Sequence, residues 1–180
     1  NIYLDTNEME NYKDNVNGMK NLVEVLEENG IKRIIHFSTQ NVNLKKKGPY
    51  AMSKERAETI LINSKLDYLL IRPNYVYGIN KANDFYKLAD FISKFRIAPV
   101  IGSGNYRIQP VQREDLVDAV IHLVNNFSSR SIVEVSGRET MSINEIIKIL
   151  GEYLKTKPLK IHIPVFFLKI LLAKYPTMGV

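Results

Sequence analysis

The feature that most constrains the fold is the segment 66–71, which is apolar at nearly every position. A strand without polar alternation is buried on both faces, as happens in a parallel sheet that helices cover. A second strand, rich in β-branched residues, is predicted over 31–37. Helical patterns occupy 15–29 and 50–64, and the first of them ends at Gly30. Strands and helices that alternate in this way predict an α/β fold with a doubly wound, mostly parallel sheet.

The pattern is looser after Gly78, where we expect a smaller lobe. The apolar segment 163–173 is predicted to be a terminal helix that packs on this lobe, and it is too short to span a bilayer. Further helices are predicted over 82–95, 113–125 and 143–153, and further strands over 99–101, 107–111, 131–135 and 159–163.

Tyr50 and Lys54 are four residues apart in a helical pattern, so their side chains share one face. A phenol ordinarily has a pKa near 10, which is too high for an acid or base at neutral pH. A neighbouring ammonium favours the phenolate and lowers that pKa. The same ammonium can bond the ribose hydroxyls of a dinucleotide. Because this spacing is common by chance, the prediction of a catalytic pair depends on its surroundings.

Those surroundings include two strand exits. Ser38 and Thr39 follow the strand 31–37, and the segment 72–78 follows the strand 66–71. Doubly wound sheets bind ligands at the carboxyl ends of their strands, so either hydroxyl could orient a reacting oxygen beside Tyr50. The alternative for each hydroxyl is a local bond to backbone groups.

Five motifs, in this order, resemble the extended or atypical short-chain dehydrogenases/reductases, the NAD(P)-dependent epimerase/dehydratase family. The resemblance implies that residues 1–78 are the carboxyl-terminal part of an NAD(P)-binding Rossmann domain. Residues 79–180 are mainly a substrate-binding lobe, with 107–135 returning to the Rossmann sheet. The motifs are Asn15-Val16-Asn17-Gly18 with Asn21-Leu22, Phe37-Ser38-Thr39-x-x-Val42, Tyr50-x-x-x-Lys54, Arg72-Pro73-x-x-Val76-Tyr77-Gly78, and Arg107 with Val111-x-x-x-Asp115.

The resemblance also implies roles for single residues. Tyr50 exchanges a proton with the substrate oxygen, Lys54 assists it, and Thr39 orients that oxygen. Tyr75 and Arg107 contact the substrate, since a guanidinium matches phosphate oxygens. For these two residues, ring packing and a surface ion pair are the alternatives. The implied cofactor-binding residues are Ser38, Tyr50, Lys54, Pro73, Asn74, Tyr75 and Val76.

The implied function is that of an NAD- or NADP-dependent oxidoreductase, epimerase or dehydratase. Its substrate is a nucleotide-linked sugar or a similar carbonyl or hydroxyl compound, and a homodimer is compatible with the family. The turn Gly-x-x-Gly-x-x-Gly that cradles the pyrophosphate is absent and is expected upstream of Asn1. Ten residues separate Thr39 from Tyr50, a short loop that is more typical of the atypical branch. The alternative is therefore a non-catalytic NAD(P)-binding regulator or assembly factor.

Composition argues against other classes. The chain has no Cys, which excludes disulfides and thiolate metal sites and is compatible with a cytoplasmic location. Its three histidines lack metal-ligand spacing, so no metal site is predicted. The net charge of +6 comes from scattered lysines, and the run 45–47 lies in a predicted loop without base-stacking aromatics. We therefore expect no nucleic-acid partner. The resemblance implies a small-molecule partner, and contact of the apolar segment 163–173 with a membrane surface is the less favoured alternative to packing on the lobe.

Overall fold

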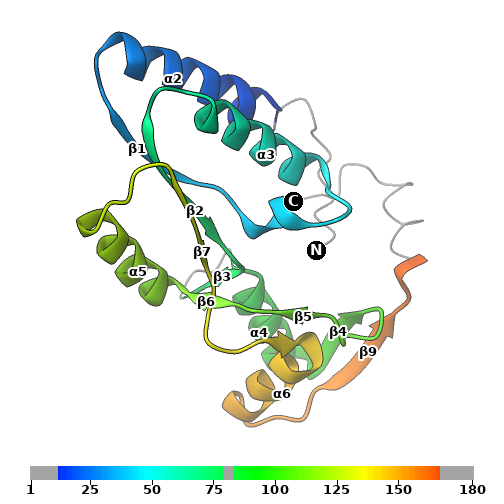
Figure 1. The fold of residues 1–180 in the computed structure, drawn as a ribbon. Coiled ribbons are helices and arrows are strands. Elements are labelled where there is room, and N and C mark those ends of the chain that lie inside the picture. Colours follow the sequence, from blue (N-terminus) through cyan, green and yellow to red (C-terminus); the bar gives the residue numbers. More distant parts are fainter. Residues whose placement is uncertain (1–11, 79–82, 167–180) are drawn as a thin grey trace. The chain divides into compact units, whose positions relative to one another are not determined.

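The structure is a computed structural model that describes residues 12–78 and 83–166 (Figure 1). These residues form two compact units. The first unit contains 12–74 and 117–135, and the second contains the remaining described residues. One boundary between the two units falls between Asn74 and Tyr75, inside the motif of residues 72–78. We describe each unit by itself.

A three-stranded parallel sheet forms the centre of the first unit. Its order is β1 (Arg33–Phe37), β2 (Asp67–Pro73) and β7 (Ser131–Val135). All neighbours run in the same direction, and the register places Phe37 opposite Ile71. The mostly parallel sheet predicted from the sequence is therefore confirmed.

Helices cover both faces of this sheet. Helices α2 (Gly18–Glu28) and α3 (Pro49–Ile62) lie together on one face, and α5 (Arg113–Asn125) lies on the other (Figure 1). This is the doubly wound arrangement expected from the alternating pattern.

A π-helical turn, Tyr12–Asn17, leads directly into α2. The helix predicted here thus begins three residues earlier than expected and has a wide first turn. It ends as predicted at Gly30, whose φ of +69° lies in the left-handed region. The next N–H, that of Ile31, donates to the Leu26 carbonyl at 2.9 Å. Because Ile31 completes the helix cap, β1 starts at Arg33, two residues later than predicted.

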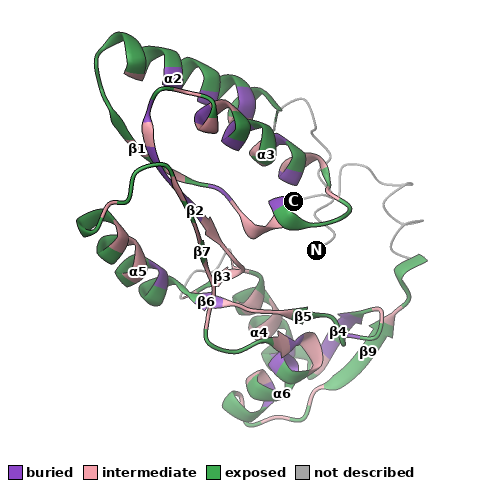
Figure 2. Ribbon diagram, in the orientation of Figure 1, coloured by how far each residue is buried: buried purple, intermediate pink, exposed green. Residues whose placement is uncertain are grey.

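The core of the first unit lies between the sheet and its two-helix layer, where Figure 2 shows most of the buried positions on the inner faces. The central strand β2 is buried from Tyr68 to Ile71. Full burial of one such apolar side chain contributes about 1.5–3 kcal/mol. The core residues are Met19, Val23, Ala57, Leu61, Leu66, Tyr68 and Leu70.

The second unit is built around a two-stranded parallel sheet. Strand β4 (Ile97–Ile101) pairs with β9 (Leu159–Ile163). Helices α4 (Asp84–Phe95) and α6 (Ile143–Tyr153) supply the other core side chains. The core residues are Ile92, Ala98, Val100 and Ile147, each fully or almost fully buried.

Two short strand pairs complete the second unit. Strand β3 (Val76–Tyr77) runs parallel to β6 (Val111–Gln112), and β5 (Arg107–Ile108) runs antiparallel to β8 (Met141–Ser142). The extended segment predicted over 107–111 thus contains β5 and leads into β6.

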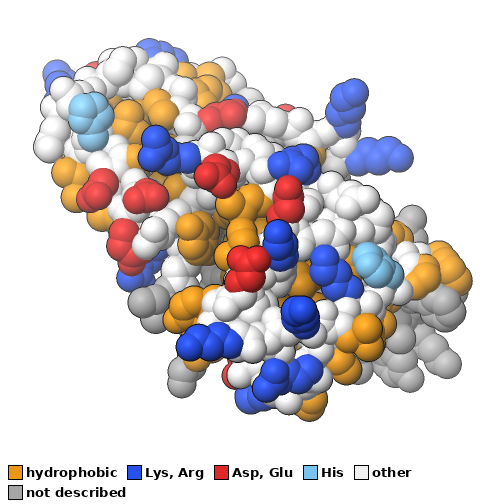
Figure 3. Space-filling model, turned by 90° about the horizontal axis from the view of Figure 1, so that it is seen from below, with side chains coloured by type: hydrophobic (Ala, Val, Ile, Leu, Met, Phe, Trp, Pro, Cys, Tyr) orange, Lys and Arg blue, Asp and Glu red, His pale blue; other side chains and the backbone are white. Residues whose placement is uncertain are grey.

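The apolar segment expected to form a terminal helix continues past Phe166, outside the described residues. Within 12–78 and 83–166, no helix is long and apolar enough to cross a bilayer. On the face shown in Figure 3, Lys and Arg side chains stand singly or in small groups among Asp, Glu and apolar side chains.

A substitution at Gly137 would test the packing of the second unit. A Cβ atom at this position would collide with the carbonyl oxygen of Pro110. We expect Gly137→Ala to lower the free energy of unfolding by about 1–3 kcal/mol, as overpacking usually does. Gly18→Ala is the matched control because nothing lies within 4 Å of its Cβ position. Urea denaturation of both variants measures the effect, and equal stability of the two would contradict the packing.

Candidate active site

Strand exits meet at the carboxyl edge of the first sheet. Ser38 donates its backbone N–H to the Ile71 carbonyl at 2.7 Å, which extends the pairing past β1. After β2, Asn74 donates its backbone N–H to Val135 at 2.8 Å and its side-chain amide to Gln40 Oε1 at 2.7 Å. The loops that follow β1 and β2 are therefore joined, as expected for parallel strands.

The two candidate hydroxyls have different surroundings. Thr39 caps a short 3-10 helix, Gln40–Asn43, because its Oγ1 accepts the N–H of Asn41 at 3.2 Å. Ser38 is 6 % exposed, and its hydroxyl has no hydrogen-bond partner among the described residues. A buried hydroxyl without a partner is unfavourable. Ser38 is thus the hydroxyl with a missing partner, while Thr39 is engaged locally.

Lys54 extends from α3 to the end of β1. Its Nζ donates to the carbonyl of Phe37 at 3.2 Å, so the ammonium lies beside the strand exit that Ser38 follows. Burial lowers the pKa of Lys54, and the negative charge of Glu58 opposes that effect. An ammonium has three N–H donors, so donors remain for the hydroxyls of a ligand.

Tyr50 lies half-buried in the first turn of α3. Two side chains hold this turn in place. Asn15, in the π-helical turn, donates to the Ser53 hydroxyl at 3.1 Å, and Ser53 donates to the Tyr50 carbonyl at 2.8 Å. The sequence placed Asn15 in a motif without a role and gave Ser53 none. The sequence signal for this link is a serine three residues after the tyrosine in a helical pattern, a spacing at which a hydroxyl can bond the carbonyl of the preceding turn.

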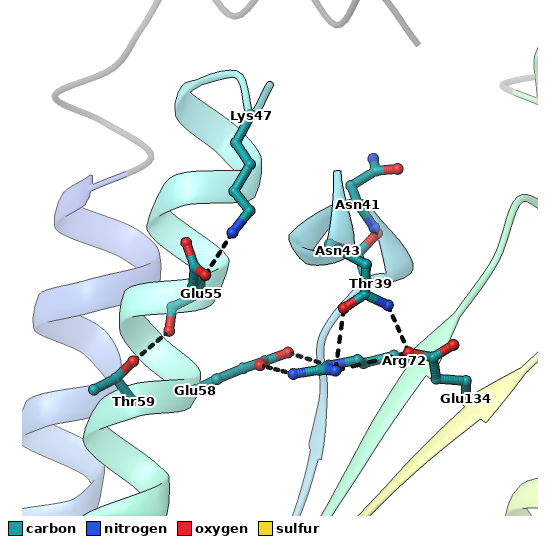
Figure 4. Close-up of polar contacts among 9 residues, drawn as sticks. All are labelled: Thr39, Asn41, Asn43, Lys47, Glu55, Glu58, Thr59, Arg72 and Glu134. Atoms are coloured by element: carbon teal, nitrogen blue, oxygen red, sulfur yellow. Dashed lines mark hydrogen bonds and ion pairs between the residues drawn. The ribbon is translucent and has the colours of Figure 1, made fainter. Parts of the chain in front are cut away.

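A buried ion pair joins α3 to β2 (Figure 4). Glu58, 2 % exposed, accepts hydrogen bonds from Arg72 Nε at 3.0 Å and Nη2 at 2.6 Å. Arg72 Nη1 lies 3.4 Å from Asn43 Oδ1 and 3.7 Å from Glu134 Oε1. The bonds to Glu58 raise the pKa of Arg72. Loss of one partner from a buried pair typically costs about 3–5 kcal/mol. Sequence reasoning missed this pair.

His36 lies on β1, two residues before Ser38. Its Nε2 atom is buried and has no hydrogen-bond partner among the described residues. Burial, followed by the positive charge of Lys54, lowers the pKa of His36 from 6.5 to about 4, although Glu58 acts in the opposite direction. The imidazole is therefore neutral near pH 7.

Tyr75 and Val76 belong to the second unit. The Tyr75 hydroxyl donates to Asp84 Oδ2 at 2.9 Å, and its ring centroid lies 4.7 Å from that of Phe85. Val76 is opposite Val111 in the β3–β6 pair. Tyr75 thus takes part in the ring packing that was the alternative to ligand contact, and its role in binding stays a prediction.

Arg107 also belongs to the second unit, and its side chain is 53 % exposed. Its Nη1 lies 3.3 Å from Glu145 Oε2, and its Nη2 donates to the carbonyl of Thr140. Glu145 also accepts the backbone N–H of Ser142 at 2.6 Å, within the capping box of α6. Arg107 thus forms a surface ion pair, and phosphate binding by this residue stays a prediction.

The sequence-predicted site residues fall into two groups. Those in the first unit gather at or near the carboxyl edge of its sheet. There the remaining N–H donors of Lys54 suit a ligand rich in hydroxyl groups, and the buried Ser38 hydroxyl has no partner among the described residues. The first group is Ser38, Thr39, Tyr50, Lys54, Pro73 and Asn74, and the second is Tyr75, Val76 and Arg107.

The sequence and the fold are similar to those of known proteins. Residues 5–126 match a family described as NAD(P)H-binding. Over 140 residues the chain is 22% identical to the mitochondrial NADH dehydrogenase [ubiquinone] 1 alpha subcomplex subunit 9 of Arabidopsis thaliana. That match covers 77% of this chain and 35% of the relative.

Solved structures have the same fold. The dTDP-glucose 4,6-dehydratase of Bacillus anthracis, in complex with NAD, has a TM-score of 0.76 at 18% identity, covering 85% of this chain and 56% of that one. A double mutant of the corresponding enzyme of Streptomyces venezuelae, with NAD bound, has a TM-score of 0.75 at 18% identity, covering 85% of this chain and 54% of that one. The ADP-L-glycero-D-manno-heptose-6-epimerase of Helicobacter pylori gives 0.72 at 22%, covering 85% and 55%. The chain thus spans just over half the length of these proteins.

The environment of His36 predicts a pH dependence of stability. Between pH 6.5 and about 4 the unfolded chain binds a proton at this imidazole and the folded protein does not. The neutral imidazole therefore makes its full contribution to the free energy of unfolding above pH 6.5. As the pH falls from 6.5 to about 4, this contribution is lost, by about 3 kcal/mol in total. We expect His36→Gln to reduce the slope of unfolding free energy against pH in this range, measured by urea denaturation.

His122→Gln is the control, because His122 is exposed. Carboxylates that titrate in the same range act equally in all three proteins, so they cancel from the differences. Parallel curves for the wild type and His36→Gln would contradict a half-buried imidazole that stays neutral in the folded protein.

Proposed function

The chain belongs to the NAD(P)H-binding family, and we propose that it forms the catalytic side of an NAD(P)-dependent epimerase, dehydratase or reductase. Its proposed substrate is a nucleotide-linked sugar or a similar carbonyl compound. The observation that carries this proposal is the contact between Lys54 Nζ and the Phe37 carbonyl at 3.2 Å. It brings the ammonium of the Tyr50–Lys54 pair to the strand exit where the Ser38 hydroxyl is buried without a partner among the described residues.

Tyr50, Thr39 and Lys54 have different tasks in the proposed reaction. Bound NAD(P) supplies the hydride acceptor or donor. Tyr50 exchanges the proton on the substrate oxygen, and Thr39 orients that oxygen through its hydroxyl. Lys54 holds the ribose hydroxyls and favours the phenolate of Tyr50. The bond from Ser53 to the Tyr50 carbonyl supports this assignment, since it fixes the helical turn that carries the phenol.

The remaining binding residues follow from the same proposal. Ser38, Pro73 and Asn74 line the sheet edge on the cofactor side, with Tyr75 and Val76 next in the chain. Tyr75 and Arg107 contact the substrate, with the guanidinium on its phosphate groups.

A second candidate is an NAD(P)-binding regulator or assembly factor without catalysis. The observation in its favour is the likeness to a protein named as a subunit of an NADH dehydrogenase subcomplex. The two candidates share the cofactor and differ in whether Tyr50 reacts.

Tyr50→Phe separates the two candidates, because it removes the reacting hydroxyl and preserves the ring. In the full-length protein we expect turnover to fall by about 10²–10⁴-fold, the usual contribution of a positioned acid or base. Cofactor affinity should change little. Tyr153→Phe is the control, since Tyr153 is 83% exposed. Steady-state kinetics with nucleotide sugars and fluorescence titration with NADH and NADPH measure both quantities. Unchanged behaviour of Tyr50→Phe in every assay would favour the regulator.

Lys54→Ala should act differently from Tyr50→Phe. It removes a donor to the ribose and the charge that favours the phenolate, so cofactor binding should weaken and the remaining activity should move to higher pH. The control is Lys20→Ala, an exposed lysine on α2. Titration with NADH and NADPH, together with a pH–rate profile, measures the change. Unaltered cofactor affinity in Lys54→Ala would remove the ribose contact from the proposal.

A further inference from the structure

Glu58 is an acidic residue in an unusual place. Its side chain is almost fully buried in the face of α3 that covers the sheet, where carboxylates are rare unless paired. It follows Lys54 by four residues, as Lys54 follows Tyr50, so the three side chains succeed one another at one-turn intervals along the helix.

Arg72 fixes this carboxylate from the sheet. It bonds both oxygens of Glu58 in a forked arrangement, at 3.0 and 2.6 Å (Figure 4). Its third nitrogen faces Asn43, in the 3-10 helix after β1, and Glu134 on β7. Asn43 in turn donates to Glu134 at 2.6 Å. Through this one guanidinium, α3 is tied to β2, to β7 and to the segment that follows β1.

The same carboxylate acts on Lys54. Both oxygens of Glu58 bond Arg72, and the carboxylate acts on Lys54 through its charge. Burial alone lowers the pKa of Lys54, and the charge of Glu58 raises it. Titratable side chains on the strands that α3 covers include His36 on β1, Arg72 on β2 and Glu134 on β7. His36 is neutral near pH 7, and Arg72 carries a positive charge.

We propose that Glu58, held by Arg72, is a positioning residue of the proposed active site. It keeps the Tyr50–Lys54 segment of α3 against the strand exits and supplies a negative charge that favours the ammonium form of Lys54. This inference rests on the proposed function for its consequence in catalysis. The effect of the Glu58 charge on the pKa of Lys54 can be measured without turnover.

The test compares Glu58→Gln with Glu55→Gln in the full-length protein. Both changes remove one carboxylate from α3, but Glu55 is exposed and pairs with Lys47 at 2.5 Å. Lysines carrying 13C-methyl groups are titrated by NMR, and the Lys54 signal is assigned by its absence from Lys54→Arg. Glu58→Gln should shift the Lys54 midpoint to lower pH. Affinity for NADH or NADPH should then fall off at a lower pH than in the wild type. Glu55→Gln should leave both curves unchanged.

Coincident curves for Glu58→Gln and the wild type would overturn the proposal. If Glu58→Gln does not fold, the double variant Glu58→Gln/Arg72→Met replaces it, because it also removes the guanidinium that Glu58 pairs with. It is compared with Arg72→Met, which lacks the same guanidinium but keeps the charge of Glu58. We expect the double variant to be more stable to heat than Arg72→Met and to have a lower Lys54 midpoint. Equal Lys54 midpoints in these two variants would reduce the pair to a structural role and also overturn the proposal.

The outcomes separate this inference from the proposed function. If Tyr50→Phe is silent while Glu58→Gln shifts the Lys54 midpoint, the catalytic function fails and the electrostatic role of Glu58 holds. If Tyr50→Phe abolishes turnover while Glu58→Gln matches Glu55→Gln in both titrations, the function holds and the role of Glu58 fails.

Discussion

The parallel pairing of β1 with β2 is the interaction on which the rest of the first unit depends. With Phe37 opposite Ile71, both strands leave the sheet at the same edge, and the next backbone N–H, that of Ser38, still bonds β2. This register leaves the Phe37 carbonyl where Lys54 Nζ reaches it from α3. A shift of one residue would turn the alternate side chains of β1 to the other face of the sheet. The position of the lysine beside the strand exit is therefore a property of strand register as much as of the helix.

Elements with strong local signals could be predicted from the sequence. The buried strand β2, the helices over 113–125 and 143–153, and the stop at Gly30 all follow from periodicity or backbone preference, and the structure confirms them. The start of β1 differs from the prediction because the N–H of Ile31 bonds the Leu26 carbonyl in the helix cap that Gly30 forms, so Ile31 belongs to the cap although its residue type favours a strand. Element boundaries depend on single hydrogen bonds, whereas element type depends on many residues together.

The candidate site shows the same division between local and distant signals. The Tyr50–Lys54 spacing is visible in the sequence because the helix itself sets it. The Glu58–Arg72 pair is not visible, since a glutamate in a helical pattern reads as a surface residue until its partner on another element is known. The contrast between Ser38 and Thr39 is hidden for a related reason. Burial of one hydroxyl and capping by the other arise from packing rather than from residue type.

Glu145 has two partners, and this has a consequence for Arg107. The carboxylate is bound by the backbone N–H of Ser142 as well as by the guanidinium, and together these bonds lower the pKa of Glu145. If the Arg107 side chain moved away, Glu145 would still bond Ser142 at the start of α6, so the cap of this helix would stay intact. An exposed ion pair of this kind is worth about 0–1 kcal/mol. The Arg107 side chain therefore loses little when it leaves Glu145, apart from its bond to the Thr140 carbonyl, and the start of α6 does not depend on where it goes.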